Sequence, residues 1–485
     1  SITEEHLKKA GFATLDPIEE LKLNEYNVVI PDITTMTREA LKETGLDNKS
    51  VVKCKNMFAL GICFWLFDRP EDYAKRYLDT KFAKKNPAIA QANKLAIDAG
   101  YNYAANTHQF ANNYTVAAAP LEKGTYRSIS GNIATAWGLC AAAEKAGLPL
   151  FCGSYPITPA TVILEELAKR KDLGVKTVQA EDEIAGICTA IGAAYAGNFA
   201  VTTTSGPGLS LKSEALGLAV MTELPLVVVD VQRGGPSTGL PTKTEQSDLQ
   251  QALYGRNGES PVAVIAASMP SDCFHYAFEA GRIAMEHMTP VVLLTDGFIA
   301  NGSEPWRIPS MKDYPKICPP IVDEAPEGGF MPYVRNERLA RGWAFPGKVG
   351  LEHRVGGLEK DSVKGSISTD PANHQKMVDT RAAKVALVAE DIPVQKVWGD
   401  EVGDLLGEGH RVSLCHFNYI HPLPHGVREI FSRFKKIVVC ELNEGQFANY
   451  LRHELQEFSY EQYNKCEGQP FTIVELREKF ESLLK

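Results

Sequence analysis

Short apolar runs alternate with longer segments of helical periodicity between residues 149 and 296, and this alternation constrains the fold more strongly than any other feature. The runs that predict strands are PLFCGS, VKTVQA, NFAVTTTS, LPLVVVDVQ, PVAVIAA and TPVVLLTD. Continuous apolar strands between amphipathic helices indicate a parallel sheet that is buried on both faces. The sequence therefore predicts an α/β fold with a doubly wound parallel sheet.

Changes in pattern along the 485 residues predict four parts. Residues 1–118 form a small helical or α/β domain, with one strand-like run, NVVIPDI, and helices at KNMFALGICFWLFDR and PAIAQANKLAIDAGYNYAA. Residues 125–310 contain the parallel sheet. Residues 311–378 are rich in Pro, Gly and charge, and predict a long segment that wraps or crosses between domains. Residues 380–485 repeat the alternation, with strands at KVALVAE, RVSLCHF and KKIVVCEL, each followed by a helix.

Composition narrows the function classes. The net charge of -9 argues against nucleic acid as the main partner, because phosphate binding needs clustered Lys and Arg. The longest apolar stretch, ALGICFWLF, is far shorter than the ~20 residues that span a bilayer, so no membrane partner is expected. The 10 cysteines include no Cys-x-x-Cys pair and mostly lie in apolar runs. They predict reduced thiols in a cytoplasmic protein and no metal or iron–sulfur site in this chain.

Four unusual stretches lie at the carboxyl ends of predicted strands, where open parallel sheets bind their ligands. SYPITPAT follows the first strand and AEDE follows the second. SGPG follows the third strand, and QRGGPSTGLPTKTEQ follows the fourth. Because the sheet brings these ends to one edge, the four stretches together predict a ligand site there.

Each stretch also has a purely structural interpretation. Thr158 would cap a helix that begins at Pro159, and SYPITPAT alone favours this interpretation. The acids in AEDE would favour a helix N-terminus, SGPG would be a plain turn, and RGGPSTG would be a solvated loop.

The functional interpretation uses the same residues differently. Two prolines stiffen the backbone of Ile157 and Thr158, which would aim a side chain. The glycines of SGPG let a ligand ring approach the backbone. Arg233 and Lys243 place two cations on one loop, which suits an anionic substrate group.

These motifs together carry a resemblance to a known family. The chain resembles the α subunit of the 2-oxoacid:ferredoxin oxidoreductases, and most closely the 2-oxoglutarate type. The motifs that carry it are YPITPA, AEDEIA, TTTSGPG, QRGGPSTGLPTKTEQSD, TDGFIANG, GLEH, HPLP and ELNEGQF. The resemblance covers about residues 50–460, and YPITP together with RGGPSTGLPT is highly specific.

The resemblance implies the nature of each domain. Residues 125–310 would be a pyrimidine-binding thiamine diphosphate domain, and residues 380–485 a transketolase-C-like α/β domain. KNMFALG resembles the family's γ domain, here fused ahead of the α part. That domain normally opens with a Gly-rich strand–turn–helix that is missing here, so we expect the γ-type domain at residues 1–118 to be incomplete at its N-terminus.

The resemblance also implies a reaction. The family decarboxylates a 2-oxoacid on thiamine diphosphate, passes electrons through [4Fe-4S] clusters to ferredoxin and delivers the acyl group to coenzyme A. A β subunit would hold the diphosphate with Mg²⁺ and the clusters, in a cytoplasmic dimer of αβ heterodimers. The expected reaction is the reversible conversion of 2-oxoglutarate to succinyl-CoA and CO2. Pyruvate or a branched-chain 2-oxoacid as substrate, or a catalytically silent scaffold subunit, remain the alternatives.

Residue roles follow from the resemblance. Glu183 would hydrogen-bond N1′ of the aminopyrimidine, and Thr158 would donate to the substrate oxygen. Lys243 stands where other members carry an Arg that clamps the substrate carboxylate, and a Lys cannot reproduce a bidentate clamp. Arg233 is the other candidate for binding the substrate. The remaining cofactor-binding residues would be Tyr155, Pro156, Ile157, Ser205, Gly206 and Pro207.

Overall fold

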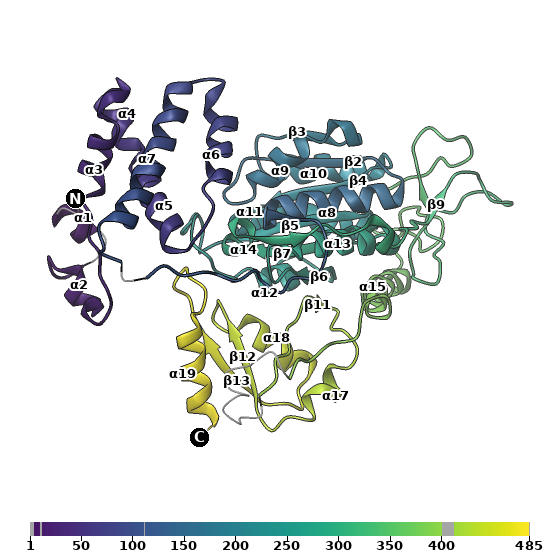
Figure 1. Cartoon of the computed structure of the whole chain (residues 1–485). Helices are drawn as coiled ribbons and strands as arrows, with labels where there is room; N and C mark the ends of the chain where they lie inside the picture. Colours follow the sequence, from purple (N-terminus) through teal and green to yellow (C-terminus); the bar gives the residue numbers. More distant parts are fainter. Residues whose placement is uncertain (1–3, 10–11, 111, 400–411, 485) are drawn as a thin grey trace. The chain divides into compact units, whose positions relative to one another are not determined.

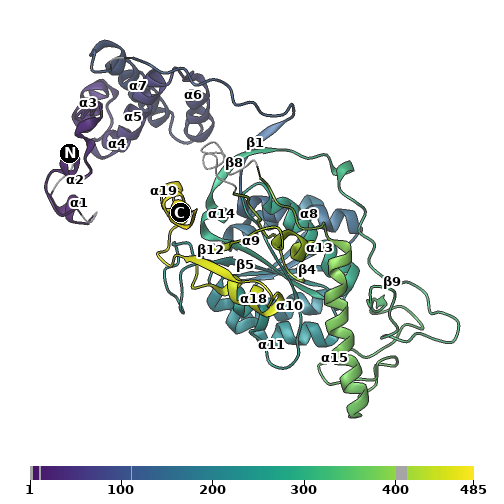
Figure 2. The same cartoon turned by 90° about the horizontal axis from the view of Figure 1, so that it is seen from below.

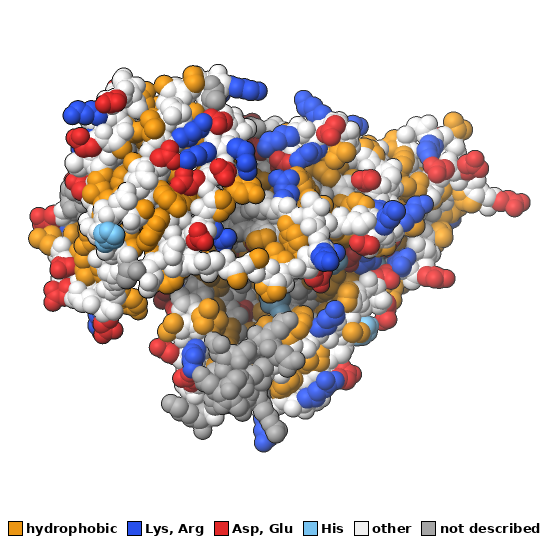
Figure 3. All heavy atoms as spheres, viewed as in Figure 1, with side chains coloured by type: hydrophobic (Ala, Val, Ile, Leu, Met, Phe, Trp, Pro, Cys, Tyr) orange, Lys and Arg blue, Asp and Glu red, His pale blue; other side chains and the backbone are white. Residues whose placement is uncertain are grey.

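A computed structural model describes residues 4–9, 12–110, 112–399 and 412–484 of the chain. The chain divides into two compact units, Ser1–Lys123 and Gly124–Lys485. Figure 1 shows the elements of both units. Charged side chains of both signs are interspersed on the face shown in Figure 3. In the described part of the chain, no helix combines the length and the apolar character needed to cross a membrane.

The described part of the first unit is helical. Its helices are α1 (Glu4–Lys9), α2 (Pro17–Glu20), α3 (Ile33–Ala40), α4 (Asn48–Lys53), α5 (Lys55–Leu66), α6 (Asp72–Leu78) and α7 (Pro87–Asn106). Helices α5 and α7 confirm the two helices that the sequence predicts here. They pack closely at Gly61, where a Cβ would lie only 2.1 Å from the Ile97 carbonyl oxygen. The predicted strand NVVIPDI is wrong. Asp32 instead caps α3 by accepting a hydrogen bond from the Thr35 amide at 3.2 Å.

The second unit is built on a seven-stranded sheet in the order β11-β6-β7-β5-β4-β2-β3. Its strands are β2 (Leu150–Ser154), β3 (Lys176–Gln179), β4 (Phe199–Thr204), β5 (Leu226–Gln232), β6 (Ala263–Ala266), β7 (Pro290–Asp296) and β11 (Tyr419–His421). Strands β2 to β7 pair in parallel, and β11 runs antiparallel to β6 at the edge. The six predicted strands and the α/β fold class are confirmed.

Helices cover both faces of this sheet, and Figure 2 shows β4 and β5 between two helical layers. One layer contains α8 (Gly131–Ala146), α9 (Thr161–Ala168) and α13 (Cys273–His287), and the other contains α10 (Glu183–Tyr195), α11 (Gly206–Thr222) and α12 (Leu249–Tyr254). Val227 and Val229 of β5 face the first layer, whereas Val228 faces the second. This alternation explains why β5 is apolar throughout.

The segment that follows β7 is anchored to the core at several points. Its regular elements are α14 (Gly297–Asn301), β8 (Ser303–Arg307), which pairs with β1 (Tyr126–Ser130), then β9 (Ile321–Val322), β10 (Trp343–Ala344) and α15 (Pro371–Ala386). The buried indole of Trp343 donates to the Ala194 carbonyl of α10 at 3.0 Å. Arg341 is also buried and bonds to the Thr222 carbonyl at the end of α11 at 3.1 Å. The segment therefore packs against the helical layer of α10 and α11.

The C-terminal part departs from two predictions. KVALVAE is not a strand, because α15 continues to Ala386 and a 3-10 helix, Leu387–Asp391, follows. In RVSLCHF the described residues form only a bridge between Trp398 and Leu414, and most of the helix predicted before it lies outside the described residues. KKIVVCEL is confirmed as β12 (Ile437–Glu441), which pairs in parallel with β13 (Tyr460–Asn464). The helices here are α17 (Val427–Phe431), α18 (Gln446–Glu454) and α19 (Ile473–Leu484).

Candidate active site

The four unusual stretches meet at the carboxyl edge of the sheet, as predicted. The Ala180 amide, after β3, donates to the Ser154 carbonyl at the end of β2 at 2.7 Å. The Tyr155 hydroxyl, after β2, lies 2.9 Å from the Thr204 hydroxyl at the end of β4. These contacts hold the loops that follow neighbouring strands against one another.

A cradle of polar groups forms around Gly208 in SGPG. A Cβ at this position would lie 2.1 Å from both Tyr155 Oη and Thr204 Oγ1, and 3.0 Å from Glu183 Cγ. Only glycine therefore allows the three side chains to converge on the first turn of α11. Burial raises the pKa of Tyr155, so its phenol stays protonated and can donate a hydrogen bond.

The acids of AEDE have separate roles. Asp182 caps α10, because its side chain accepts from the Ala185 amide at 2.8 Å, so it does the structural work expected of an acid at a helix start. Glu181 is exposed, whereas Glu183 is half-buried and faces the cradle at Gly208. The structure thus singles out Glu183 as the acid that lies among the other site residues.

Lys212 is a site residue that the sequence reasoning missed. It is fully buried on α11, and its ammonium donates to the Glu183 carbonyl at 2.7 Å and to Thr202 Oγ1 at 3.2 Å. It also lies 5.0 Å from the centre of the Tyr155 ring. Burial lowers the pKa of Lys212 to about 8, although the Glu183 carboxylate opposes this shift. The signal was a single Lys in an apolar helix, LSLKSEALGLAV.

The stiff stretch SYPITPAT does not use Thr158 as a helix cap. Helix α9 begins at Thr161, whose hydroxyl accepts from the Ile157 amide at 2.8 Å and donates to the Ile157 carbonyl at 3.0 Å. Thr158 itself is exposed, as is Pro156. The structural interpretation of Thr158 is therefore wrong, and its side chain is left available to a ligand.

The two candidate cations lie in different surroundings. Arg233 is 5% exposed, and it donates to the Thr158 carbonyl at 2.6 Å and to the Thr238 carbonyl at 3.3 Å. Lys243 is exposed, and a Cβ on Gly468 would lie 2.8 Å from its side-chain stem. Arg233 therefore positions Thr158, whereas the Lys243 ammonium remains accessible.

The loop that carries both cations, residues 233–248, is fixed by the C-terminal part of the unit. The Thr244 amide donates to the Gly468 carbonyl at 3.2 Å, and the Gln246 amide donates to the Leu442 carbonyl at 2.9 Å. The loop is thus bonded to the segments that flank β12 and β13.

A buried pair of acids lies beside the start of α11. Asp230 of β5 is fully buried, and a Cβ on Gly206 would lie 2.6 Å from Asp248 Oδ1. Burial, reinforced by the Asp248 carboxylate, raises the pKa of Asp230 well above its ordinary value, and burial raises the pKa of Asp248 to about 6. Asp230 therefore keeps its proton at pH values at which a free aspartate has lost it. The Ser205 hydroxyl and Asp230 have no hydrogen-bond partner in the part of the chain that the structure describes.

Comparison with known families defines the class of this site. Residues 142–369, which include strands β2 to β7 and all four loops, match the family described as pyruvate flavodoxin/ferredoxin oxidoreductase, thiamine diphosphate-binding. The carboxyl edge of the sheet is therefore that of a thiamine diphosphate-binding domain.

Individual relatives of the chain are named for one 2-oxoacid, 2-oxoglutarate. The chain is 50% identical over 469 residues to the 2-oxoglutarate oxidoreductase subunit KorA of Mycobacterium tuberculosis, covering 93% of this chain and 71% of that one. It is 35% identical to the 2-oxoglutarate synthase subunit KorA of Methanothermobacter marburgensis, covering 66% of this chain and 88% of the relative.

A solved structure of a 2-oxoglutarate:ferredoxin oxidoreductase is also similar to the chain. The 2-oxoglutarate:ferredoxin oxidoreductase from Magnetococcus marinus, with 2-oxoglutarate, coenzyme A and succinyl-CoA bound, superposes with a TM-score of 0.82 at 33% identity. The match covers 93% of this chain and 80% of that one. The chain belongs to the family of 2-oxoglutarate oxidoreductase α subunits.

Proposed function

We propose that the chain is the α subunit of an enzyme that converts 2-oxoglutarate and coenzyme A to succinyl-CoA and CO2, with reversible reduction of ferredoxin. One observation carries this proposal: Glu183, Tyr155 and Thr204 converge on Gly208 at the carboxyl edge of a sheet that matches a thiamine diphosphate-binding family. The relatives that are named for 2-oxoglutarate, and the related structure that binds it with coenzyme A, support the choice of substrate.

The described residues fit the aminopyrimidine half of thiamine diphosphate. The Ser205 hydroxyl is buried without a partner in the described part of the chain, and Glu183 is half-buried beside the start of α11. Thiamine diphosphate, when bound, supplies the electron sink for decarboxylation of a 2-oxoacid. The Glu183 carboxylate would hold a proton at N1′, and Lys212 would orient Glu183 through its backbone carbonyl. We assign the remaining contacts with the aminopyrimidine to Tyr155, Pro156, Ile157, Ser205, Gly206 and Pro207.

Substrate recognition divides between an aimed hydroxyl and an accessible cation. The exposed Thr158 would donate to the substrate carbonyl oxygen, and Arg233 holds the Thr158 backbone in place from below the surface. The Lys243 ammonium would meet a substrate carboxylate, since burial of a carboxylate is costly unless a cation pairs with it.

A partner subunit completes the site in this proposal. We assign the diphosphate and Mg²⁺ site, together with the [4Fe-4S] clusters, to a β subunit in a dimer of αβ heterodimers that reduces ferredoxin in the cytoplasm. The absence of Cys-x-x-Cys pairs from the sequence and the naming of the relatives as subunits support this assignment.

Co-purification of the chain with its partner tests the proposed function. The complex should reduce methyl viologen when 2-oxoglutarate and coenzyme A are both present, and more slowly or not at all with pyruvate or branched-chain 2-oxoacids. Preference for another 2-oxoacid would overturn the substrate assignment. A complex that is inactive with every 2-oxoacid would instead favour a scaffold subunit.

A further inference from the structure

Lys212 places a buried positive charge inside the candidate active site. Its side chain is 0% exposed on α11. In the described part of the chain, its ammonium donates to a backbone carbonyl at 2.7 Å and to a hydroxyl at 3.2 Å, and both acceptors are uncharged. A buried charge is costly unless a carboxylate is bonded to it, so an apolar side chain would serve a purely structural role better.

The Lys212 ammonium reaches three other segments of the site. It bonds to the Glu183 carbonyl in the first turn of α10 and to Thr202 Oγ1 of β4. A Cβ on Gly186 would lie 3.4 Å from the ammonium nitrogen, so α10 passes close to it. The nitrogen also lies 5.0 Å from the centre of the Tyr155 ring, which follows β2. The charge is therefore held beside the backbone that carries Glu183.

Glu183 is the carboxylate most strongly coupled to this charge. The titratable groups that face the ammonium are Glu183, Asp182 and Cys188 at α10, and Cys152 and Tyr155 on or after β2. Burial raises the pKa of Cys152 to about 12 and also raises the pKa of Tyr155, so both stay neutral. Asp182 is engaged as the cap of α10. Of the acidic groups, Glu183 has the largest effect on the pKa of Lys212.

The charge of Lys212 can be lost without loss of its hydrogen bond. Burial lowers the pKa of Lys212 to about 8, so the charge is present at neutral pH and disappears in mildly alkaline solution. A neutral amine still donates to the Glu183 carbonyl. Release of the proton therefore removes the electrostatic effect on Glu183 and leaves the position of its backbone unchanged.

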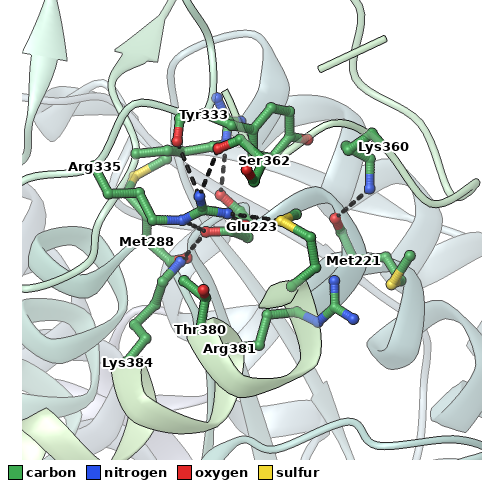
Figure 4. Close-up of polar contacts among 12 residues, drawn as sticks. Met221, Glu223, Met288, Tyr333, Arg335, Lys360, Ser362, Thr380, Arg381 and Lys384 are labelled. Carbon is green, nitrogen blue, oxygen red and sulfur yellow. Dashed lines mark hydrogen bonds and ion pairs between the residues drawn. The ribbon is translucent and has the colours of Figure 1, made fainter. Parts of the chain in front are cut away.

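A second buried lysine provides a comparison within the same chain (Figure 4). Lys360 is 3% exposed, donates to the Met221 carbonyl at 2.9 Å and lies 5.5 Å from the centre of the Tyr333 ring. Burial lowers its pKa to about 8 as well. Its surroundings thus resemble those of Lys212. However, Met221 lies at the C-terminal end of α11, which spans about 25 Å, whereas the candidate active site lies at the start of this helix.

We propose that the positive charge of Lys212 controls where the proton between Glu183 and the aminopyrimidine is held. A cation beside a carboxylate favours its ionised form, so the proton leaves the Glu183 carboxyl and is held at N1′. This inference rests on the proposed function and adds a regulation by pH, because the site loses activity when Lys212 releases its own proton. Lys212 is a positioning residue, since it acts through Glu183.

Unfolding of the full chain, without cofactor or partner, tests whether Lys212 titrates. The unfolded chain holds this proton up to about pH 10.5, whereas the folded chain releases it near pH 8. The free energy of unfolding therefore gains a contribution that rises with pH between these values. Lys212→Met and Lys360→Met keep the length of the side chain, and each should reduce this rise. An unchanged slope in Lys212→Met would overturn the proposal.

The pH profile of turnover separates the two lysines. The wild-type complex, saturated with 2-oxoglutarate and coenzyme A, should lose activity through an alkaline limb near pH 8. Lys212→Met should lower kcat at pH 7 about 10- to 100-fold, leave KM for 2-oxoglutarate nearly unchanged and lack this limb. Lys360→Met should retain the wild-type kcat and profile. An alkaline limb that persists in Lys212→Met would overturn the proposal.

Binding of thiamine diphosphate gives a readout without turnover. In calorimetric titrations of the complex at pH 7, Lys212→Met should bind the cofactor about 10-fold more weakly, because the charge-assisted hydrogen bond to N1′ is weakened, and Lys360→Met should bind it normally. A wild-type complex that is inactive with every 2-oxoacid would contradict the proposed function and leave this binding test in force. An active wild-type complex together with normal binding in Lys212→Met would overturn only the role of Lys212.

Discussion

The two ends of helix α11 bury charged groups in opposite ways. At its start, Asp248 lies beside Gly206 and interacts with Asp230, and several oxygens of the two acids have no partner in the described part of the chain. At its end, cations surround Glu223, and both oxygens of this carboxylate are bonded. The helix dipole favours negative charge at the first end and positive charge at the second, so the sign of the charge fits each end.

The difference between the ends lies in how they are covered. Residues 333–384 cover the C-terminal end and supply a cluster of five buried cations, Arg335, Arg341, Lys360, Arg381 and Lys384. Around the N-terminal end, Glu183 remains half-buried and Thr158 remains exposed. The buried charges at the C-terminal end therefore hold the fold together, whereas at the N-terminal end the half-buried Glu183 and the exposed Thr158 can still contact a ligand. Substitutions at the two ends should accordingly change different measured quantities.

Loss of the Glu223 charge should have the largest effect, and the effect should be on stability. Although burial opposes ionisation, Lys384 and Arg335 lower the pKa of Glu223 to about 2. Its contribution is therefore complete above the ordinary pKa of a glutamate and is lost as the pH falls toward 2. Glu223→Gln leaves two buried cations without their carboxylate, which should lower the free energy of unfolding at pH 7 by about 3–5 kcal/mol in a denaturant titration.

The matched control for Glu223 lies on the exposed face of the same helix. Glu214→Gln removes one carboxylate from α11 without uncovering a buried cation, so it should change stability by less than about 0.5 kcal/mol. Equal losses in the two variants would show that the cluster does not depend on Glu223.

The next largest effect should fall on turnover. Glu183→Gln keeps the size of the side chain but removes the carboxylate that would act at N1′, so turnover of the complex should drop about 100-fold or more. The melting temperature should stay within about 1 °C. Glu181→Gln, two residues away and exposed, serves as the control and should retain normal turnover. Near-normal turnover in the Glu183 variant would place the acid elsewhere.

The acid pair gives a pH-dependent prediction. Because the folded chain holds a proton that free aspartates release, the free energy of unfolding should fall as the pH rises from about 4 through 6. Asp230→Asn replaces the protonated carboxyl with an amide that does not titrate, so it should reduce this fall in denaturant titrations at pH 4.5, 6 and 8. Asp172→Asn, an exposed control, should leave the slope unchanged. An unaltered slope in Asp230→Asn would mean that Asp230 does not hold this proton.

The smallest effect should come from the exposed Lys243. Lys243→Ala should reduce kcat/KM for 2-oxoglutarate about 10-fold, as expected for the loss of one charge-assisted hydrogen bond. The same assay with pyruvate identifies the contact. A loss confined to 2-oxoglutarate places Lys243 at the distal carboxylate, and equal losses place it beside the keto group. No change with either substrate would remove Lys243 from the site.

The sequence predicted the sheet well because its strands are buried on both faces, and apolar runs such as LPLVVVDVQ leave little choice of structure. Two other apolar runs predicted strands that the structure does not contain, and each has a physical reason. In NVVIPDI, Pro31 lacks a backbone N–H and Asp32 caps the next helix, so local capping outweighs strand propensity. KVALVAE contains branched residues, but its Lys384 bonds to Glu223, so a distant contact fixes the segment as helix.

The candidate site was predictable where its residues stand in unusual loops. Glu183, Thr158 and Arg233 lie in such loops, and the structure brings Arg233 to the Thr158 carbonyl. Lys212 and Asp230 escaped notice because a lone charged residue within a helix or strand usually marks a solvated face. Their burial depends on contacts with segments that are distant in the sequence, which no local pattern encodes.

The bonds between residues 233–248 and the C-terminal part have a consequence for exchanging parts between relatives. A hybrid that receives this loop alone would lose or mismatch the hydrogen bonds at Thr244 and Gln246, because their acceptors belong to Gly468 and Leu442. The loop and the turns beside β12 and β13 therefore form one transferable module despite their separation of about 200 positions in the chain. Altered substrate preference in a chimera requires that both pieces come from the same donor.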